Sequence, residues 1–210
     1  MTTKITIKHE GPDTHNVKQT QLASIVLTYG AHSTREDGVC AEEAVALLAG
    51  LGHTDSPPCA SPVLIALGQR LNDSGWSSNA ARTAAIAPYL LPQIGTAGDG
   101  LDQRRAYALA DVAVREIAPE ALDAAGLHEH AATLRALAPI VDQATARAAG
   151  AAAVAAGAAA GAAARAAVEA AGAAGDAEDA WAAARAAVEA GDAVLTRWTA
   201  RLFTVALGEP

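Results

Sequence analysis

The chain has 210 residues, of which 51% are hydrophobic, 18% are charged and only 3% are aromatic. This length suits one large domain or two small ones, and the apolar content is sufficient to bury a core. The formal net charge of −8 argues against a surface that neutralises phosphates, as nucleic-acid binding requires. We therefore expect a soluble, acidic, helix-rich protein that does not bind nucleic acid.

Three features of the sequence bear on location. Residues 1–8 lack the apolar stretch of a signal peptide. The longest uncharged run, residues 148–164, is almost entirely Ala and Gly, which gain little free energy on transfer into lipid. The two cysteines, Cys40 and Cys59, are typical of a protein in a reducing compartment. We expect a cytoplasmic protein without membrane contact.

The first 36 residues contain the only strand-like pattern. Residues 4–8 alternate polar and β-branched apolar side chains, and the turn residues 11–13 follow them. Residues 22–29 form a second candidate strand, although a helix fits them nearly as well. We predict a short N-terminal β-hairpin, in which His32 is a solvated surface histidine.

The middle of the chain is divided by glycines and prolines into short apolar segments. Helices are expected over residues 40–48, 62–71, 79–91, 101–117, 119–125 and 127–137. Ser61 is the expected N-cap of the second helix, and Pro92 and Pro119 are expected helix breaks. With the hairpin, these helices form the predicted N-terminal domain, residues 1–141, as a compact array.

The remainder, residues 142–210, is alanine-rich and predicts an antiparallel helical hairpin, which completes a mainly α fold. Gly172 and Gly175 followed by Asp176 indicate a helix stop and a new N-cap. In the second helix, large apolar side chains recur at heptad spacing, and the first helix offers a stripe of small residues. The stripes are Trp181, Val188, Leu195 and Leu202 on one helix, and Val154, Gly157, Gly161 and Val168 on the other. Such a hairpin packs either on its own domain or against a partner protein.

Polar residues of the types used in catalysis concentrate between residues 37 and 59. Cys40 begins a helix, where the dipole and free amide groups lower a thiol pKa, and Glu43 lies one turn further on the same face. The loop that follows is long enough to bring His53 and Asp55 back to this face. As an enzyme site, Cys40 is the nucleophile, His53 the general base, Asp55 its orienter and Glu43 an acid–base group. The full catalytic set is Cys40, Glu43, His53, Asp55, Asn72 and Asp73.

The same stretch also contains ligand types that zinc accepts. The candidate zinc ligands are Cys40, His53, Asp55 and Cys59. Their spacing matches no zinc finger or ribbon, so inert packing cysteines, a disulfide and a reactive thiol remain alternatives. We predict that the two thiols lie in one polar pocket and are reduced in the cell.

Several motifs together resemble an uncharacterised family of actinobacterial and actinophage proteins. They are Asp37-Gly38-Val39-Cys40 with Glu43-Ala44-Val45-Ala46, Asp55-x-Pro57-x-Cys59, Ser61-Pro62-Val63, Asn72-Asp73, Gln103-Arg104-Arg105-Ala106-Tyr107 and the Ala-Ala-Trp tail. The resemblance spans residues 30–200 and implies no reaction, ligand or partner. It departs at Ser61, where relatives often have a third cysteine, and in the tail, where they have more tryptophans.

Two hypotheses of function follow. The first is a non-enzymatic helical protein of phage or prophage origin that acts through a protein partner or self-association. The second is a small enzyme with a thiol- or metal-based site around Cys40, His53, Asp55 and Cys59, with zinc as the candidate cofactor. The absence of a complete catalytic motif favours the first hypothesis.

Overall fold

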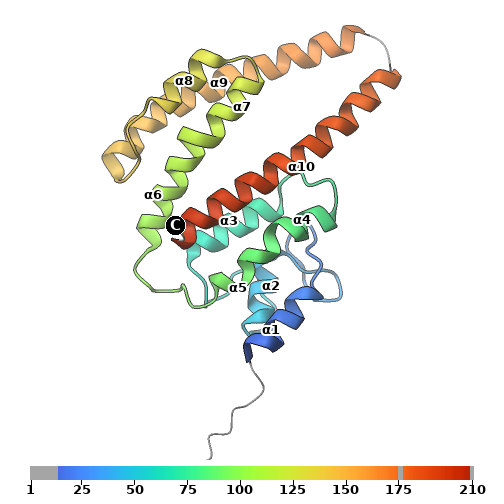
Figure 1. Cartoon of the computed structure of the whole chain (residues 1–210), viewed down its shortest axis with the longest axis vertical. Helices are drawn as coiled ribbons and strands as arrows, with labels where there is room; N and C mark the ends of the chain where they lie inside the picture. Colours follow the sequence, from blue (N-terminus) through green and yellow to red (C-terminus); the bar gives the residue numbers. More distant parts are fainter. Residues whose placement is uncertain (1–13, 175–176, 209–210) are drawn as a thin grey trace, which may run out of the picture.

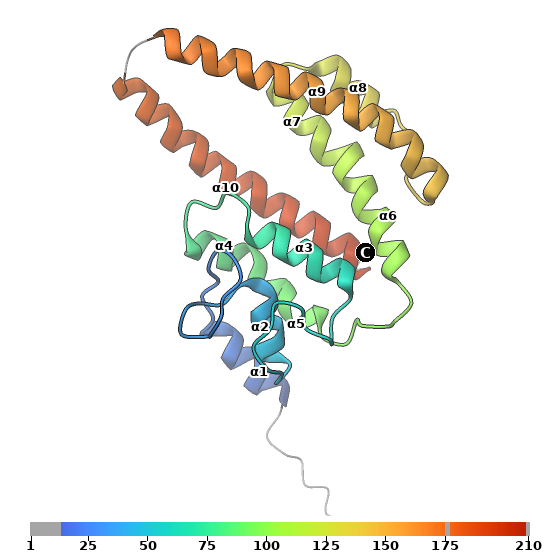
Figure 2. The ribbon, with the colours of Figure 1, turned by 180° about the vertical axis from the view of Figure 1, so that it is seen from behind.

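Helices make up most of this molecule, which confirms the mainly α prediction. The structure is a computed structural model that describes residues 14–174 and 177–208, and Figures 1 and 2 show it from opposite sides. The elements are α1 (Thr14–Ala23), α2 (Ala41–Leu48), α3 (Pro62–Asn72), α4 (Asn79–Ile86), the 3-10 turn η1 (Ala87–Tyr89), α5 (Leu90–Gln93), α6 (Asp102–Val112), the π-helical η2 (Ala113–Ile117), α7 (Ala118–Ala124), α8 (His128–Arg135), α9 (Gln143–Ala174) and α10 (Ala177–Leu207).

The predicted β-hairpin falls partly outside the described residues, which exclude its first strand, residues 4–8. The second predicted strand, residues 22–29, begins in the last turn of α1 and continues as irregular backbone, and the described part of the chain contains no strand. Burial alternates in this segment, because Leu27 is fully buried and Val26 is 60% exposed. The Leu27 N–H donates to Thr83 Oγ1 (2.8 Å) rather than to a neighbouring strand.

The larger hydrophobic core lies among α1–α5 and the C-terminal end of α10. α2 is buried on nearly all sides. Besides Val45 and Leu48, its buried residues are mostly alanines, whose small side chains allow neighbouring elements to pack closely against the helix. Ser61 caps α3 as predicted, since its Oγ accepts the N–H of Val63 (3.2 Å). The start of α2 lies next to the end of α3, where Asn72 Oδ1 accepts the N–H of Ala41 (3.2 Å).

The predicted proline break at Pro119 is wrong. Pro119 lies inside a continuous helix formed by α6, η2 and α7, whereas the helical stretch from α4 to α5 ends at Gln93, one residue after Pro92. A proline in a helix has no N–H to donate and its ring crowds the preceding turn. The widened π-helical turn of η2, immediately before Pro119, accommodates this defect without ending the helix.

The described parts of the two long helices pack on different elements of the molecule. The first half of α9 packs on α8 and joins a second hydrophobic cluster with α7, whereas the last third of α10 packs on α6, α4 and α3. Val154 of the predicted small-residue stripe is 75% exposed. The side chains of Trp181 and Val188 lie outside the described residues. None of the described helices has a segment long and apolar enough to cross a membrane.

Polar contacts connect α10 to α6 and to η2. The Arg105 guanidinium donates to Ala206 O (2.9 Å) at the end of α10 and pairs with Asp99 (2.6 Å) before α6. Further along α10, Arg201 pairs with Glu116 of η2 (2.7 Å). In Figure 2, α10 accordingly runs alongside α3 and reaches the start of α6 at its C-terminal end.

Candidate functional site

Several predicted catalytic residues meet in a small polar recess. The recess has a volume of about 240 Å³ and is lined by Gly30, Ala31, Cys40, Asp55, Gln69, Asn72 and Asp73. It lies where the start of α2, the end of α3 and the loop between them come together. From the predicted set, the structure therefore brings together Cys40, Asp55, Asn72 and Asp73.

Asn72 is fully buried and connects three segments at the back of this recess. Its Nδ2 donates to Thr28 O (2.9 Å) and to Asp73 Oδ1 (2.9 Å), and its Oδ1 accepts the N–H of Ala41 (3.2 Å). Asp73 Oδ1 also accepts the N–H of Gly30 (2.8 Å). Both the oxygen and the nitrogen of the Asn72 side-chain amide thus help to hold α2, α3 and the segment around Thr28 together.

Glu43 is the centre of a second set of contacts next to the recess. This buried carboxylate accepts the N–H of Cys40 (2.8 Å), the N–H of His32 (2.6 Å) and a hydrogen bond with His32 Nδ1 (2.9 Å). His53 Nε2 lies 3.5 Å from Glu43 and 2.9 Å from His32 O. Burial raises the pKa of Glu43, but the hydrogen bonds from Cys40 and His32 outweigh it, so the pKa is lowered overall.

His32 is part of this set although it was expected to be a solvated histidine. Its side chain is only 12% exposed, against Glu43. The sequence offered no signal for this contact, because it depends on a turn at residues 34–37 that returns the chain to α2. The turn is held by Asp37, whose carboxylate accepts from the Thr34 hydroxyl (3.0 Å).

The order Thr28, His32, Glu43 matches the hydroxyl, imidazole and carboxylate of a nucleophilic triad. Thr28 Oγ1 lies 3.1 Å from His32 Nε2, the ring nitrogen opposite the one that faces Glu43. However, Gly38 lies directly over this pair: a Cβ at Gly38 would be 2.5 Å from both Thr28 Oγ1 and His32 Nε2. Thr28 Oγ1 also accepts the N–H of Val39 (3.0 Å). The covered hydroxyl supports a structural role for these contacts.

The expectation of a lowered thiol pKa at Cys40 is wrong. Cys40 is only 3% exposed, and burial raises its pKa to about 12. The amide N–H of Glu43 at the start of α2 lowers the pKa by less than burial raises it, and the Glu43 charge raises it further. At neutral pH the recess therefore contains a thiol and no thiolate nucleophile.

The predicted zinc ligands are not brought together. Cys59 does not line the recess, and its carbonyl accepts the N–H groups of Gly95 (2.8 Å) and Ala97 (3.3 Å) after α5. In residues 14–174 and 177–208, no three His, Cys, Asp or Glu side chains gather as metal ligands. The structure thus places Cys40 alone of the two cysteines at the recess.

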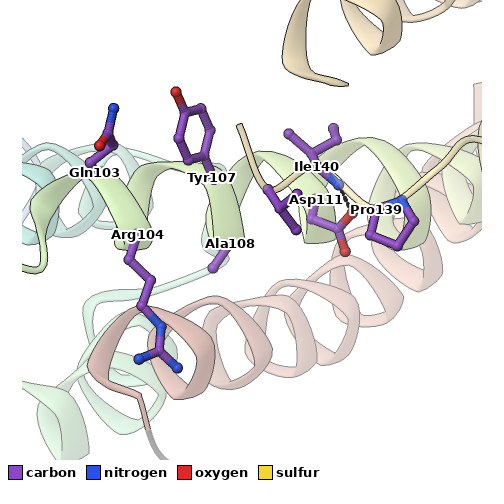
Figure 3. A pocket seen from close by; sticks show the side chains of 8 residues that line it. Gln103, Arg104, Tyr107, Ala108, Asp111, Pro139 and Ile140 are labelled. Carbon is purple, nitrogen blue, oxygen red and sulfur yellow. Dashed lines mark hydrogen bonds between the residues drawn. The ribbon is translucent and has the colours of Figure 1, made fainter. Parts of the chain in front are cut away.

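A larger hollow lies on α6, as Figure 3 shows. This α6 groove has a volume of about 510 Å³ and is lined by Gln103, Arg104, Tyr107, Ala108, Asp111, Pro139, Ile140 and Val141. One end is closed by Asp111, whose Oδ1 accepts the N–H of Ile140 (2.8 Å) and pairs with Arg115 (3.0 Å). In Figure 3, Gln103 and Tyr107 project to one side of α6 and Arg104 to the other.

Sequence reasoning missed the α6 groove. Residues 103–107 entered the sequence prediction only through the family resemblance. The lining positions 103, 107 and 111 recur at helical spacing along one side of α6, and positions 104 and 108 recur along another. That periodicity was available as a signal, but the segment 139–141 that closes the groove is about thirty residues away in the chain.

Comparisons of the chain with protein-family models, with curated proteins and with solved structures find no match. The recess and the α6 groove therefore provide the structural basis for a proposal of function. The recess is small and its asparagine and glutamate neighbours are engaged in hydrogen bonds, whereas the α6 groove is larger and more apolar.

Proposed function

We propose that this chain is a helical binding protein that acts through contact with a partner protein, with the α6 groove as its docking surface. The observation that supports this is the groove itself, whose volume of about 510 Å³ falls within the range of ligand sites. Ala108, Pro139 and Val141 give it an apolar lining, and Val141 is 67% exposed. An exposed apolar surface beside a hollow is typical of an interaction site.

The shape of the groove favours a protein segment over an enclosed small molecule. Small-molecule sites usually bury most of the ligand surface, whereas this groove is open to one side. Its floor follows α6 from Gln103 to Asp111, a length of about 12 Å at the helical rise per residue. About 12 Å matches three or four residues of an extended peptide. A partner segment is thus held in the groove while the rest of the partner continues outside it.

A small enzyme centred on the recess is the second candidate. It is favoured by the meeting of Cys40, Asp55, Asn72 and Asp73 in one hollow. Against it, the Cys40 thiol is protonated at neutral pH and Asn72 is fully engaged in hydrogen bonds. A phage or prophage origin is also part of the proposal, on the family resemblance alone.

Selection from a random peptide library on the purified chain tests the binding function. Selected peptides are then measured on Ala108→Trp, in which the indole fills the floor of the groove. The matched control is Ala106→Trp, on the exposed face of α6 outside the lining. We expect Ala108→Trp to weaken binding at least about tenfold, as the loss of a buried apolar contact does, and Ala106→Trp to leave it unchanged. A library without binders, or binders that Ala108→Trp does not affect, would contradict the proposal.

A further inference from the structure

We infer that the partner segment in the α6 groove presents a carboxylate to Arg104 next to an aliphatic side chain. This inference rests on the proposed function and names the chemistry of the ligand. The aliphatic part is dictated by the lining of Ala108, Pro139 and Val141. The carboxylate follows from the charges around the groove.

Among the described arginines of α6, η2, α8 and α10, Arg104 lines the groove and is the one without a partner. Its guanidinium forms no ion pair or hydrogen bond with a residue in the described ranges. Its neighbours on α6, η2, α8 and α10 do: the pairs are Arg105–Asp99, Arg115–Asp111, Arg135–Asp123, Arg197–Glu120 and Arg201–Glu116. In a chain with a net charge of −8, an arginine left unmatched at the edge of an apolar groove provides an anion-binding group.

The groove offers no comparable partner for a cation. Among the described residues, Asp111 is the only carboxylate in its lining, and the Ile140 N–H and the Arg115 guanidinium already occupy it. Gln103 and Tyr107 lie on the side of α6 opposite Arg104, and neither bonds to a described residue through its side chain. This distribution selects an anionic over a cationic ligand.

Two synthetic peptides test the inference, acetyl-Glu-Leu-Leu-amide and acetyl-Gln-Leu-Leu-amide, which differ only in the charge. Binding is followed by NMR through the methyl signals of Ala108, Ile140 and Val141. We expect the Glu peptide to bind about fivefold more tightly, the upper range for an exposed ion pair, with a preference that falls as salt is added. Arg104→Gln is expected to remove the preference and Arg104→Lys to keep most of it. Arg147→Gln, an exposed arginine on α9, controls for net charge and should preserve it.

The outcomes separate the ligand chemistry from the proposed function. Equal binding of the two peptides, lost in Ala108→Trp, would overturn the carboxylate and leave the groove as the docking site. A preference that survives in Arg104→Gln would overturn the role of Arg104 in the same way. If neither peptide shifts the groove methyls, or if Ala108→Trp binds both as well as the native chain, the inference and the proposed function both fail.

Discussion

The polar side chains around Glu43 and those that line the α6 groove differ in whether they have hydrogen-bond or ion-pair partners. The buried Glu43 carboxylate is hydrogen-bonded to the backbone N–H groups of His32 and Cys40 and to the His32 imidazole. In the α6 groove, Arg104 and Tyr107 reach solvent without a hydrogen bond or ion pair to a described residue. The dense polar cluster in the sequence thus fixes loops in the fold, whereas the docking surface proposed above lies where polar side chains have no partner among the described residues.

The largest expected effect concerns the thiol at the recess. Because burial raises the Cys40 pKa to about 12 from 9.0, its thiolate fraction at mildly alkaline pH falls roughly 1000-fold, three pKa units. Iodoacetamide should therefore modify Cys40 about that much more slowly in the folded chain than in concentrated urea, as mass spectrometry of the Cys40 peptide measures. Comparable rates in the two states would return Cys40 to the enzyme hypothesis and break the comparison.

Removal of the carboxylate at the centre of the Glu43 contacts should be strongly destabilising. In Glu43→Gln, the single amide oxygen replaces only one of the two carboxylate oxygens that accept hydrogen bonds from Cys40 and His32, and the amide nitrogen at the other position donates instead. We expect the free energy of unfolding to fall by about 3 kcal/mol, as when one partner of a buried charged contact is removed. Urea unfolding measures it, with Glu129→Gln on the exposed surface of α8 as the matched control. Equal stability of the two variants would contradict the structural role of Glu43.

A smaller effect is expected at Gly68, where α3 meets the buried Glu42. A Cβ at Gly68 would be 1.9 Å from Glu42 Oε1, and Glu42 is fully buried and has little room to move. Gly68→Ala should therefore cost about 2 kcal/mol of stability, as overpacking of a core does. In the Glu42→Ala background the same substitution should cost much less. Equal costs in both backgrounds would show that the two residues do not crowd each other.

Glu42 also gives a pH dependence that differs from that of a paired carboxylate. Burial raises its pKa to about 8 from 4.5; the Gln93 amide lowers it and the Asp55 charge adds to the rise. Between these values the folded state keeps a proton that the unfolded state releases, so stability is lost as pH rises through this window. Glu42→Gln cannot titrate, so its stability relative to the native chain should increase by up to about 1.4 kcal/mol per pH unit there. Parallel urea-unfolding midpoints at all pH values would contradict this.

Local sequence rules predicted the helices well and tertiary contacts poorly. The Ser61 cap and the glycine and proline spacing were sufficient for α2 and α3, and those helices brought Asn72 and Cys40 together. The predicted lowering of the Cys40 pKa was wrong because burial in the assembled core raises the pKa by more than the helix end lowers it. The predicted helix break at Pro119 was wrong because a π-helical turn accommodates the proline within the helix.

The α6 groove could not be predicted for a different reason. Ile140 and Val141 close it only because the chain returns from α8 to α6, where the Ile140 N–H reaches Asp111. Hydrophobic periodicity describes one element at a time and does not report such a return. The unmatched state of Arg104 likewise emerges only when the acid partners of its neighbours are known.

The most direct test of the central claim, that this chain acts through the α6 groove and not through the recess, is to locate a bound peptide. Methyl NMR spectra of the chain, recorded with and without a library-selected peptide, report both hollows at once. The account predicts shifts at Ala108, Ile140 and Val141, which line the groove, and none at Ala31, which lines the recess. Shifts at Ala31 with unchanged groove methyls would contradict it.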